Sequence, residues 1–421
     1  MNNTMVKYIK HLSAYFGASL VPMLLMLAIN PLIALNMTPE DYAVTGYYSS
    51  FNSLISPLII FYMLHYYNKR YFELDQLGRL QLKALLYKVI LSFSFIVTIL
   101  CFTALWGYIR VFNSGMQFPI LPYLAFSVFA LPLAGLFNLE LADLKMERNS
   151  KAFFRLSVTN GIILTILNLL FVVVIKWGAS GKLLAPLIAN FVVFVILFYK
   201  NRFLLRVNNS WNEFIQLIKF CSPLTLAAML GYFFSGFDKT YMESLGDMSE
   251  YGYYIVGASM ANYLNAFSTS IASTFQPDIY EAISKTDNRY LFKTVILQVA
   301  LTTSIVVLFI ILCPIVIKIL TAGRYMDSIT YARIISVSTI TSCIYYIINN
   351  YTIAKGYSQL SLYTTIFASV MVIIILPFIA NKFQYIGGAW MASGSFVILT
   401  VINLLFLHFK KLTKNYKQTQ I

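Results

Sequence analysis

Charged residues are scarce in this chain of 421 residues. They make up 11% of it, whereas hydrophobic residues make up 59% and the mean hydropathy is +0.72. A soluble domain carries roughly a quarter charged residues, so this chain has too few of them to cover itself with a hydrated surface. The shortage excludes a water-soluble globular fold and makes lipid the expected solvent.

Histidine and cysteine are also rare, with three and four residues respectively. The cysteines (Cys101, Cys221, Cys313 and Cys343) lie far apart, in or beside apolar segments. Their spacing fits neither a metal site nor a disulfide framework, and no nucleotide-binding loop is present. We therefore expect no metal and no cofactor, and we expect the cysteines to serve packing.

The apolar residues form long blocks, and most blocks approach the roughly 20 residues that a membrane-spanning helix needs. Alternating segments of about ten residues, typical of outer-membrane barrels, are absent. The first block follows Lys7 and Lys10 and is too long for a cleaved signal, so it reads as the first span. The sequence thus predicts an all-α integral membrane protein with about twelve helices. We place them at 12–35, 43–67, 84–108, 119–142, 156–176, 183–200, 218–242, 251–277, 291–317, 328–354, 358–380 and 385–409.

The lysines and arginines favour one side of these predicted spans. One alternating set of loops and ends carries 22 of them and the other carries 8. Because positive residues concentrate in cytoplasmic loops, we expect both termini in the cytoplasm. The same bias explains the net charge of +15, so no nucleic-acid partner is needed.

Two weak similarities suggest a tandem repeat. PEDYAVTGYYSSF (39–51) resembles MSEYGYYIVGASM (248–260), and WGASGKLLAPLIANFV (177–192) resembles YIGGAWMASGSFVI (385–398), at offsets of about half the chain. A repeat of six helices would give two lobes that enter the membrane the same way. We predict an N-lobe at 1–205 and a C-lobe at 206–421, around a central cleft.

Polar residues follow one face of the predicted helix 251–277. Asn262, Asn265, Thr269, Ser273 and Gln276 are spaced by three or four residues, which draws a continuous stripe. Amides are costly against lipid, so the stripe faces either a polar cleft or other helices through hydrogen bonds. The repeat offset places Ser53 and Ser56 at the positions of Asn262 and Asn265. Both lobes would then offer a polar face to the cleft.

Few charges fall within the predicted spans. Asp238 and Lys239 lie in the last turns of 218–242, and Arg333 lies near the start of 328–354. Arg333 shares one helical face with Ser336, Thr339, Cys343, Tyr346 and Asn350. Charges near helix ends can reach the interface, so the residues alone leave a functional and a structural role open. For Glu140 and Asp143 we favour a structural role.

Several of these motifs resemble one known family. Pro223, Asp238-Lys239, Leu245-Gly246 and Tyr251-Gly252, followed by Pro277, are similar to the pattern of the bacterial polysaccharide (O-antigen) flippases. These flippases belong to the multidrug and oligosaccharidyl-lipid exporter superfamily. The segments 35–51 and 319–335 resemble external loops of the same family, although Ala43 stands where glycine is usual. The resemblance covers the chain from end to end in length and topology.

The resemblance implies a two-lobed fold similar to that of MATE transporters, whose cleft opens alternately to each side of the bacterial inner membrane. The implied cargo is an undecaprenyl-pyrophosphate-linked oligosaccharide, with membrane lipid around it and polysaccharide-assembly proteins as further partners. A cation in the cleft would offset the pyrophosphate charge. Arg333 and Lys239 are the candidates, with Asp238 as the neutralising or coupling partner.

Three alternatives remain at this point. A drug or cation antiporter shares the fold but usually has a deep carboxylate in the N-lobe, and the predicted helices 12–35 and 43–67 have none. A flippase for lipid-linked peptidoglycan precursors differs only in its cargo. A membrane polysaccharide polymerase or ligase would be an enzyme, and it would typically carry a long external loop that this chain lacks. We therefore expect a transporter.

Overall fold

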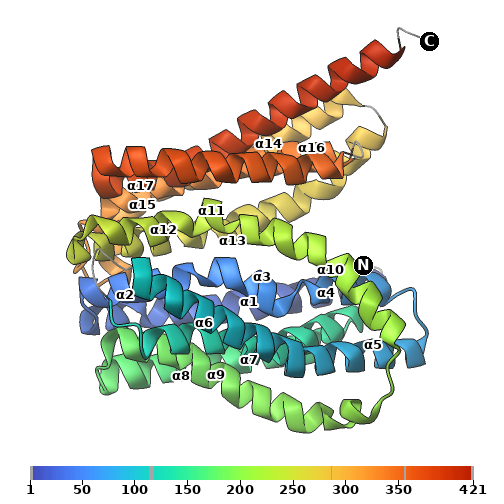
Figure 1. Cartoon of the computed structure of the whole chain (residues 1–421), viewed down its shortest axis with the longest axis horizontal. Helices are drawn as coiled ribbons and strands as arrows, with labels where there is room; N and C mark the ends of the chain where they lie inside the picture. Colours follow the sequence, from blue (N-terminus) through green and yellow to red (C-terminus); the bar gives the residue numbers. More distant parts are fainter. Residues whose placement is uncertain (1–2, 113–117, 286, 355–356, 419–421) are drawn as a thin grey trace. The chain divides into compact units, whose positions relative to one another are not determined.

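The computed structural model describes residues 3–112, 118–285, 287–354 and 357–418, and within them every regular element is helical (Figure 1). Eight helical segments are long and apolar enough to cross a membrane, and Leu20–Asn36 is a shorter apolar helix. One of the eight, Gln359–His408, contains Gln384 with a φ of +50°, which separates two helices at the predicted position. The protein is thus an all-helical, multi-pass membrane protein. The count of twelve spans stays a prediction.

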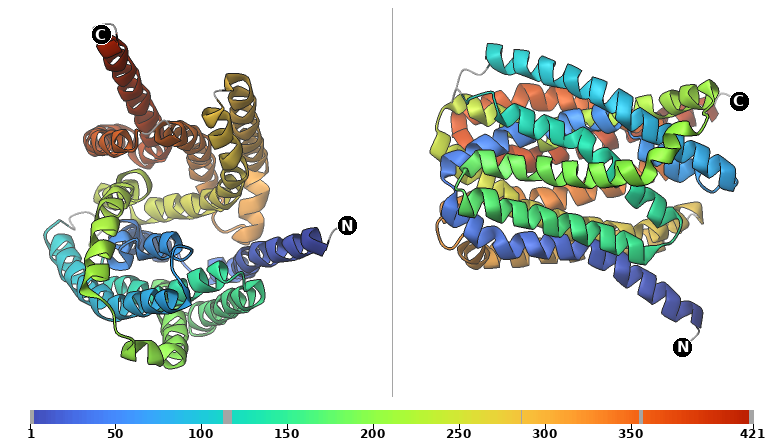
Figure 2. Two further views of the ribbon diagram at one scale, coloured as in Figure 1. Left: turned by 90° about the vertical axis from the view of Figure 1, so that its right-hand side faces the viewer. Right: turned by 90° about the horizontal axis from the view of Figure 1, so that it is seen from below.

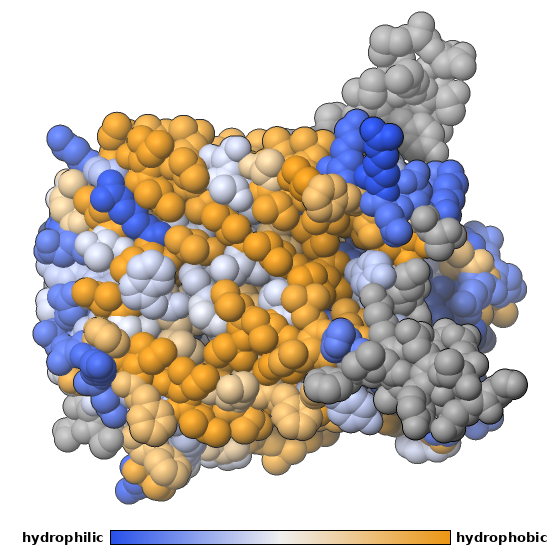
Figure 3. All heavy atoms as spheres, turned by 90° about the horizontal axis from the view of Figure 1, so that it is seen from above, coloured by the Kyte–Doolittle hydropathy of each residue, from blue (hydrophilic) through white to orange (hydrophobic). Residues whose placement is uncertain are grey.

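The chain divides into two compact units. Unit 1 comprises Met1–Met229 with Leu320–Ala322, and unit 2 comprises Leu230–Ile319 with Gly323–Ile421. The predicted lobe boundary after residue 205 stays a prediction. Figure 3 shows that one face of the molecule is apolar across its middle and hydrophilic towards two opposite ends. This pattern is expected of a surface that meets lipid between two aqueous phases.

Unit 1 is a bundle in which α7 packs on α9 and α1 packs on α8 (Figure 2). Its elements are α1 (Asn3–Asn36), α2 (Pro39–Ser50), α3 (Asn52–Ile60), α4 (Met63–Arg70), α5 (Gln76–Val89), η1 (Ile90–Ser94), α6 (Phe95–Phe112), α7 (Tyr123–Met146), α8 (Ser150–Asn168), η2 (Leu169–Val174), α9 (Gly178–Asn201), η3 (Arg202–Arg206) and α10 (Trp211–Leu230).

The predicted helix 43–67 consists of three helices, α2 to α4. α3 ends where Phe61 and Tyr62 adopt left-handed backbone angles, with φ values of +52° and +48°. The N–H of Phe61 closes α3 on the carbonyl of Pro57 at 2.8 Å. Residues other than glycine rarely adopt left-handed backbone angles. Hydrophobic periodicity alone therefore does not reveal such a break in the helix.

The turn between α1 and α2 is fixed by a capping box. The Asp41 N–H donates to Thr38 Oγ1 at 3.2 Å, and the Thr38 N–H donates to Asp41 Oδ2 at 2.9 Å. Asp41 Oδ1 also accepts from the N–H of Ala179 at 2.8 Å, at the start of α9. Gly178 makes this approach feasible, because a Cβ there would lie 2.4 Å from Asp41 Oδ1.

Unit 2 is a second bundle, in which α13 packs on α15 and α16, and α16 packs on α17. Its elements are α11 (Tyr232–Ser235), α12 (Phe237–Met242), η4 (Glu243–Leu245), α13 (Met248–Ser284), α14 (Asn288–Leu320), α15 (Ser328–Ser336), α16 (Ser338–Ala354) and α17 (Ser358–Gln418). Gly257 lets α13 lie directly against α15, since a Cβ there would meet three atoms of α15 at 2.7–2.9 Å.

Candidate functional site

Unit 2 contains a polar cavity of about 240 Å³. Its wall is built by α11 and α12, by the middle of α13, and by parts of α14, α15, α16 and α17. Five of the ten residues predicted from the sequence lie on this wall. These are Asp238, Lys239, Asn262, Asn265 and Thr269.

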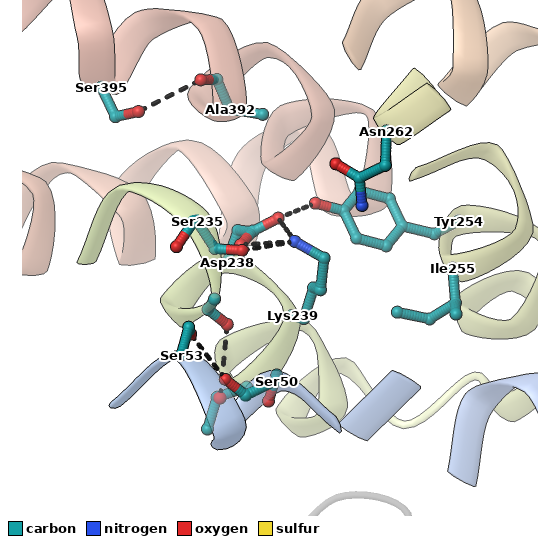
Figure 4. A network of polar contacts seen from close by, with 12 residues as sticks. Ser50, Ser53, Ser235, Asp238, Lys239, Tyr254, Ile255, Asn262, Ala392 and Ser395 are labelled. Atoms are coloured by element: carbon teal, nitrogen blue, oxygen red, sulfur yellow. Dashed lines mark hydrogen bonds and ion pairs between the residues drawn. The ribbon is translucent and has the colours of Figure 1, made fainter. Parts of the chain in front are cut away.

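Asp238 is the centre of the charged part of the wall. Its carboxylate is 3.2 Å from the ammonium of Lys239 on the same short helix, and it accepts a hydrogen bond from the hydroxyl of Tyr254 on α13 (Figure 4). The Lys239 ammonium also donates to the carbonyl of Ser235 at 2.8 Å. Asp238 is 8% exposed. A carboxylate this buried needs partners, and Lys239 and Tyr254 provide them.

The polar stripe of α13 continues the wall. The Asn265 amide donates to Asn262 Oδ1 at 3.1 Å, and the Thr269 hydroxyl donates to the Asn265 carbonyl at 2.9 Å. All three side chains are exposed, whereas Leu264 on another face of the helix is buried. Exposed amides in the middle of an apolar bundle indicate a surface that meets water or a polar ligand.

The other predicted residues of unit 2 lie elsewhere. Gln276 is exposed but does not line the cavity, and the side chain of Ser273 lies outside the described residues. Arg333 does not line the cavity either. Its Nε donates to the backbone carbonyl of Ile310 on α14 at 3.1 Å.

A proline explains this position of Arg333. The carbonyl of Ile310 would normally accept from the N–H four residues later, but that residue is Pro314, which has none. The guanidinium therefore supplies the donor that the helix lacks. Arg333 thus stabilises a proline-interrupted helix in this structure.

Ser53 and Ser56 lie on α3 in unit 1 and are partly buried. The Ser53 hydroxyl donates to the carbonyl of Ser50, the last residue of α2, at 2.8 Å (Figure 4). Back-bonding of this kind satisfies a hydroxyl without any ligand. Their assignment to a cleft stays a prediction.

Sequence reasoning missed several residues of the cavity wall, notably Gln298, Ser342, Tyr346 and Phe396. A signal for Gln298 was present, because Thr294, Gln298 and Thr302 repeat every four residues along α14. Tyr346 lies on the predicted helical face below Arg333, and that face alone assigns it to no cavity. Phe396 gave no signal, since nothing distinguishes it from the other apolar residues of its helix.

A second charged cluster lies within unit 1. Lys83 on α5 contacts Glu140 at 3.0 Å and Asp143 at 2.5 Å, both on α7, while Lys200 on α9 contacts Glu140 at 2.6 Å. The hydroxyl of Tyr67 donates to Asp143. The two carboxylates are buried and fully partnered, as a structural ion-pair network requires.

A larger cavity in unit 2, of about 690 Å³, is lined mainly by aliphatic residues of α13, α14, α16 and α17. It offers little that could bind a polar group. In the described part of the chain, no three histidine, cysteine, aspartate or glutamate side chains gather as a metal site would require. The polar cavity is therefore the stronger candidate.

Solved structures of membrane transporters share this fold. The lipid II flippase MurJ in an inward closed conformation is 16% identical, with a TM-score of 0.72 over 95% of this chain and 87% of that chain. An inward-facing multidrug resistance MATE family transporter of the MOP superfamily is 14% identical, with a TM-score of 0.67 over 96% and 99%. An outward-facing one is 15% identical, with a TM-score of 0.60 over 95% and 96%. At these identities the likeness establishes the fold.

The family itself is established by sequence. Residues 78–330, more than half of the chain, match the family model described as polysaccharide biosynthesis protein. No curated protein sequence gives a significant match. The family match and the shared fold confirm the resemblance that the motifs around Asp238-Lys239 predicted. The chain belongs to the polysaccharide biosynthesis protein family and has the fold of the MOP exporter superfamily.

Proposed function

We propose that the protein is a flippase that moves an undecaprenyl-pyrophosphate-linked oligosaccharide across the bacterial inner membrane by alternating access. The cargo would be the repeat unit of an O-antigen or a related surface polysaccharide. The observation that carries the proposal is the polar cavity of unit 2, with the Asp238–Lys239 pair and the α13 amides in an otherwise apolar helical bundle. The family match supports the polysaccharide pathway.

The physical problem of this transport fits such a cavity. A lipid-linked oligosaccharide carries a polar head that cannot enter hydrocarbon unaided, because each unsatisfied polar group there costs several kcal/mol. Hydroxyls and amides on a protein wall can replace the lost water. The polyprenyl tail is apolar and needs no such shelter, so it can stay in the lipid.

A flippase for lipid-linked peptidoglycan precursors is the second candidate, because the lipid II flippase MurJ shares the fold with a TM-score of 0.72. The two candidates differ in the cargo, and deletion separates them. Loss of a peptidoglycan flippase stops cell-wall growth, whereas loss of a repeat-unit flippase removes the surface polysaccharide and leaves the wall intact.

Deletion also separates a flippase from a polymerase. We expect the deletion strain to lose its surface polysaccharide while lipid-linked repeat units persist on the cytoplasmic leaflet. A polymerase deletion would still allow single units to cross and reach their acceptor. If single units appear on the surface of the deletion strain, with no redundant transporter present, the flippase proposal is wrong.

Topology provides an independent test. We propose two six-helix lobes, residues 1–205 and 206–421, with both termini in the cytoplasm. Reporter fusions at Lys145, Asn208 and Lys414 should then report cytoplasm, and those at Thr38 and Asp247 should report periplasm. A periplasmic signal at Asn208 would contradict both the helix count and the lobe boundary.

Cysteine labelling tests whether the α13 stripe is reached by water. In a background without the four native cysteines, Asn262→Cys and Asn265→Cys should react with a small hydrophilic thiol reagent. Leu264→Cys is the matched control, because Leu264 lies between them on the same helix and is 5% exposed. Equal labelling at all three positions would rule out a polar cavity at this stripe.

A further inference from the structure

The cavity wall of unit 2 combines two kinds of surface. Aromatic rings of Phe234, Tyr346 and Phe396 line it together with the carboxamides of Asn262 and Asn265. The rings form one group, since the centroid of Phe396 is 6.3 Å from that of Phe234 and 6.4 Å from that of Tyr346. Tyr346 is 52% exposed, so a large part of this side chain remains available for contact.

The charges on the wall cancel. Asp238 and Lys239 are its only charged lining residues among those described, and they pair with each other. The Lys239 ammonium has acceptors at 2.8, 3.2 and 3.3 Å, which matches its three N–H donors. A pyrophosphate would have to compete with Asp238 for this cation, whereas a neutral group would leave the pair intact.

Gln298 adds a polar group without a full set of partners. The side chain is 2% exposed, and its Nε2 has the thiol of Cys343 at 3.7 Å as a weak neighbour. Its Oε1 has no hydrogen-bond partner in the described part of the chain. Buried carboxamides are normally satisfied. If the carboxamide is flipped, its oxygen and nitrogen exchange places, and one of the two atoms still has no hydrogen-bond partner. A ligand hydroxyl can pair with either atom, because a hydroxyl both donates and accepts hydrogen bonds.

These features match the chemistry of a sugar ring, which has apolar C–H faces and a rim of hydroxyls. The volume of about 240 Å³ lies just below the roughly 300–1,000 Å³ of drug-sized ligand pockets, so a single ring fits better than an oligosaccharide. Resting on the proposed function, we propose that this cavity is a subsite for one neutral sugar of the cargo and does not hold the pyrophosphate. Tyr346 and Phe396 contact the face of the ring, and Asn262, Asn265 and Gln298 bind its hydroxyls.

Labelling protection tests this assignment. The reporter is Thr269→Cys, an exposed position on the cavity wall that has no assigned contact with the sugar. The protein is reconstituted without its native cysteines and treated with a hydrophilic thiol reagent. The probes are a ten-carbon isoprenyl pyrophosphate and the same lipid carrying N-acetylglucosamine, glucose or galactose. At least one sugar-bearing probe should slow labelling fivefold or more relative to the bare pyrophosphate. Equal protection by the bare pyrophosphate would overturn the sugar subsite while leaving a lipid-linked cargo in place.

Variants of the aromatic wall sharpen the test. Tyr346→Leu should reduce the protection by the sugar-bearing probe to less than about twofold, and Tyr346→Phe should preserve it, because the ring face remains. Tyr346 is half exposed, so this exchange leaves the packed core unchanged. If the sugar-bearing probe protects the Tyr346→Leu variant as well as it protects the unchanged protein, the proposed contact between the sugar ring and Tyr346 is wrong.

The proposed hydrogen bond from the sugar to Gln298 is tested by one variant and a matched control. Gln298→Leu should raise the probe concentration for half-maximal protection about 5- to 10-fold, which corresponds to one lost hydrogen bond. Thr294→Val, one turn away on the same buried face of α14 but outside the cavity wall, should change it less than twofold. Equal effects of both variants would overturn the role of Gln298. Absence of protection by every probe would overturn the subsite, while the deletion phenotype decides the flippase proposal separately.

Discussion

The role of Arg333 can be tested against the proline that explains it. The Nε of Arg333 is 3.1 Å from the carbonyl of Ile310, which lacks its helical donor because residue 314 is proline. Replacement of Pro314 by alanine would restore that donor within α14. The two residues should therefore be energetically coupled although they lie on different helices.

The size of the coupling follows from the contact. A hydrogen bond to a charged group contributes about 1.5–3 kcal/mol, and loss of the donor leaves a partly buried carbonyl unpaired. We expect Arg333→Met to lower the free energy of unfolding by about that amount. In a Pro314→Ala background the carbonyl has its own N–H, so the same exchange should cost less than about 1 kcal/mol. The coupling energy of the cycle should then reach about 1–2 kcal/mol.

The measurement is the free energy of unfolding in mixed micelles for four purified proteins: the unchanged protein, Arg333→Met, Pro314→Ala and the double variant. Export of surface polysaccharide is the second readout. Export by the double variant should be close to that of the Pro314→Ala protein. A cost of Arg333→Met that is the same in both backgrounds would refute the capping role. Lost export in the double variant at normal stability would instead return Arg333 to the cargo pathway.

Three further predictions concern packing and charge, and each can be measured as the free energy of unfolding in the same micelles. Gly257→Ala places a methyl group 2.7–2.9 Å from α15 and should cost about 1–3 kcal/mol. Gly394→Ala is the control and should be nearly neutral, because its methyl group would meet Met391 Sδ at 3.6 Å. A similar cost for both variants would contradict the close approach. Lys83→Met should cost about 3–5 kcal/mol, because it leaves two buried carboxylates short of a partner. Lys200→Met should cost less than about 1 kcal/mol, because the Lys200 side chain is 60% exposed. A larger cost for Lys200→Met than for Lys83→Met would refute the assignment of Lys83 as the central cation. Gly178→Ala combines a positive φ with a clash at 2.4 Å and should cost at least about 1–3 kcal/mol, and an unchanged stability would mean that the turn before α9 is not constrained.

The features that sequence could predict are those with a local period. Three- and four-residue spacing places Asn262, Asn265 and Thr269 on one face of a helix whatever surrounds it. The all-helical membrane fold follows equally from the length of the apolar runs. The break near Gln384 also follows from the sequence, because two apolar runs meet there at a polar segment.

The features that sequence could not predict depend on partners far along the chain. Arg333 looked like a cleft cation, yet its contact is with a carbonyl 23 residues away, freed by a proline on another helix. Phe396 and Tyr346 acquire their meaning only when α16 and α17 bring them to the same cavity. Single-helix periodicity contains no information about which helices become neighbours.

The ion-pair network of unit 1 has a consequence for biogenesis. An isolated charge at the bilayer centre costs about 2.5–3.5 kcal/mol, and less towards the interface. Lys83 is synthesised first, and its two counterions on α7 follow 57 and 60 residues later. Lys200, the second lysine of the network, follows Glu140 by another 60 residues. The nascent chain can therefore pair the carboxylates of α7 with a lysine that has already been synthesised, before Lys200 on α9 follows.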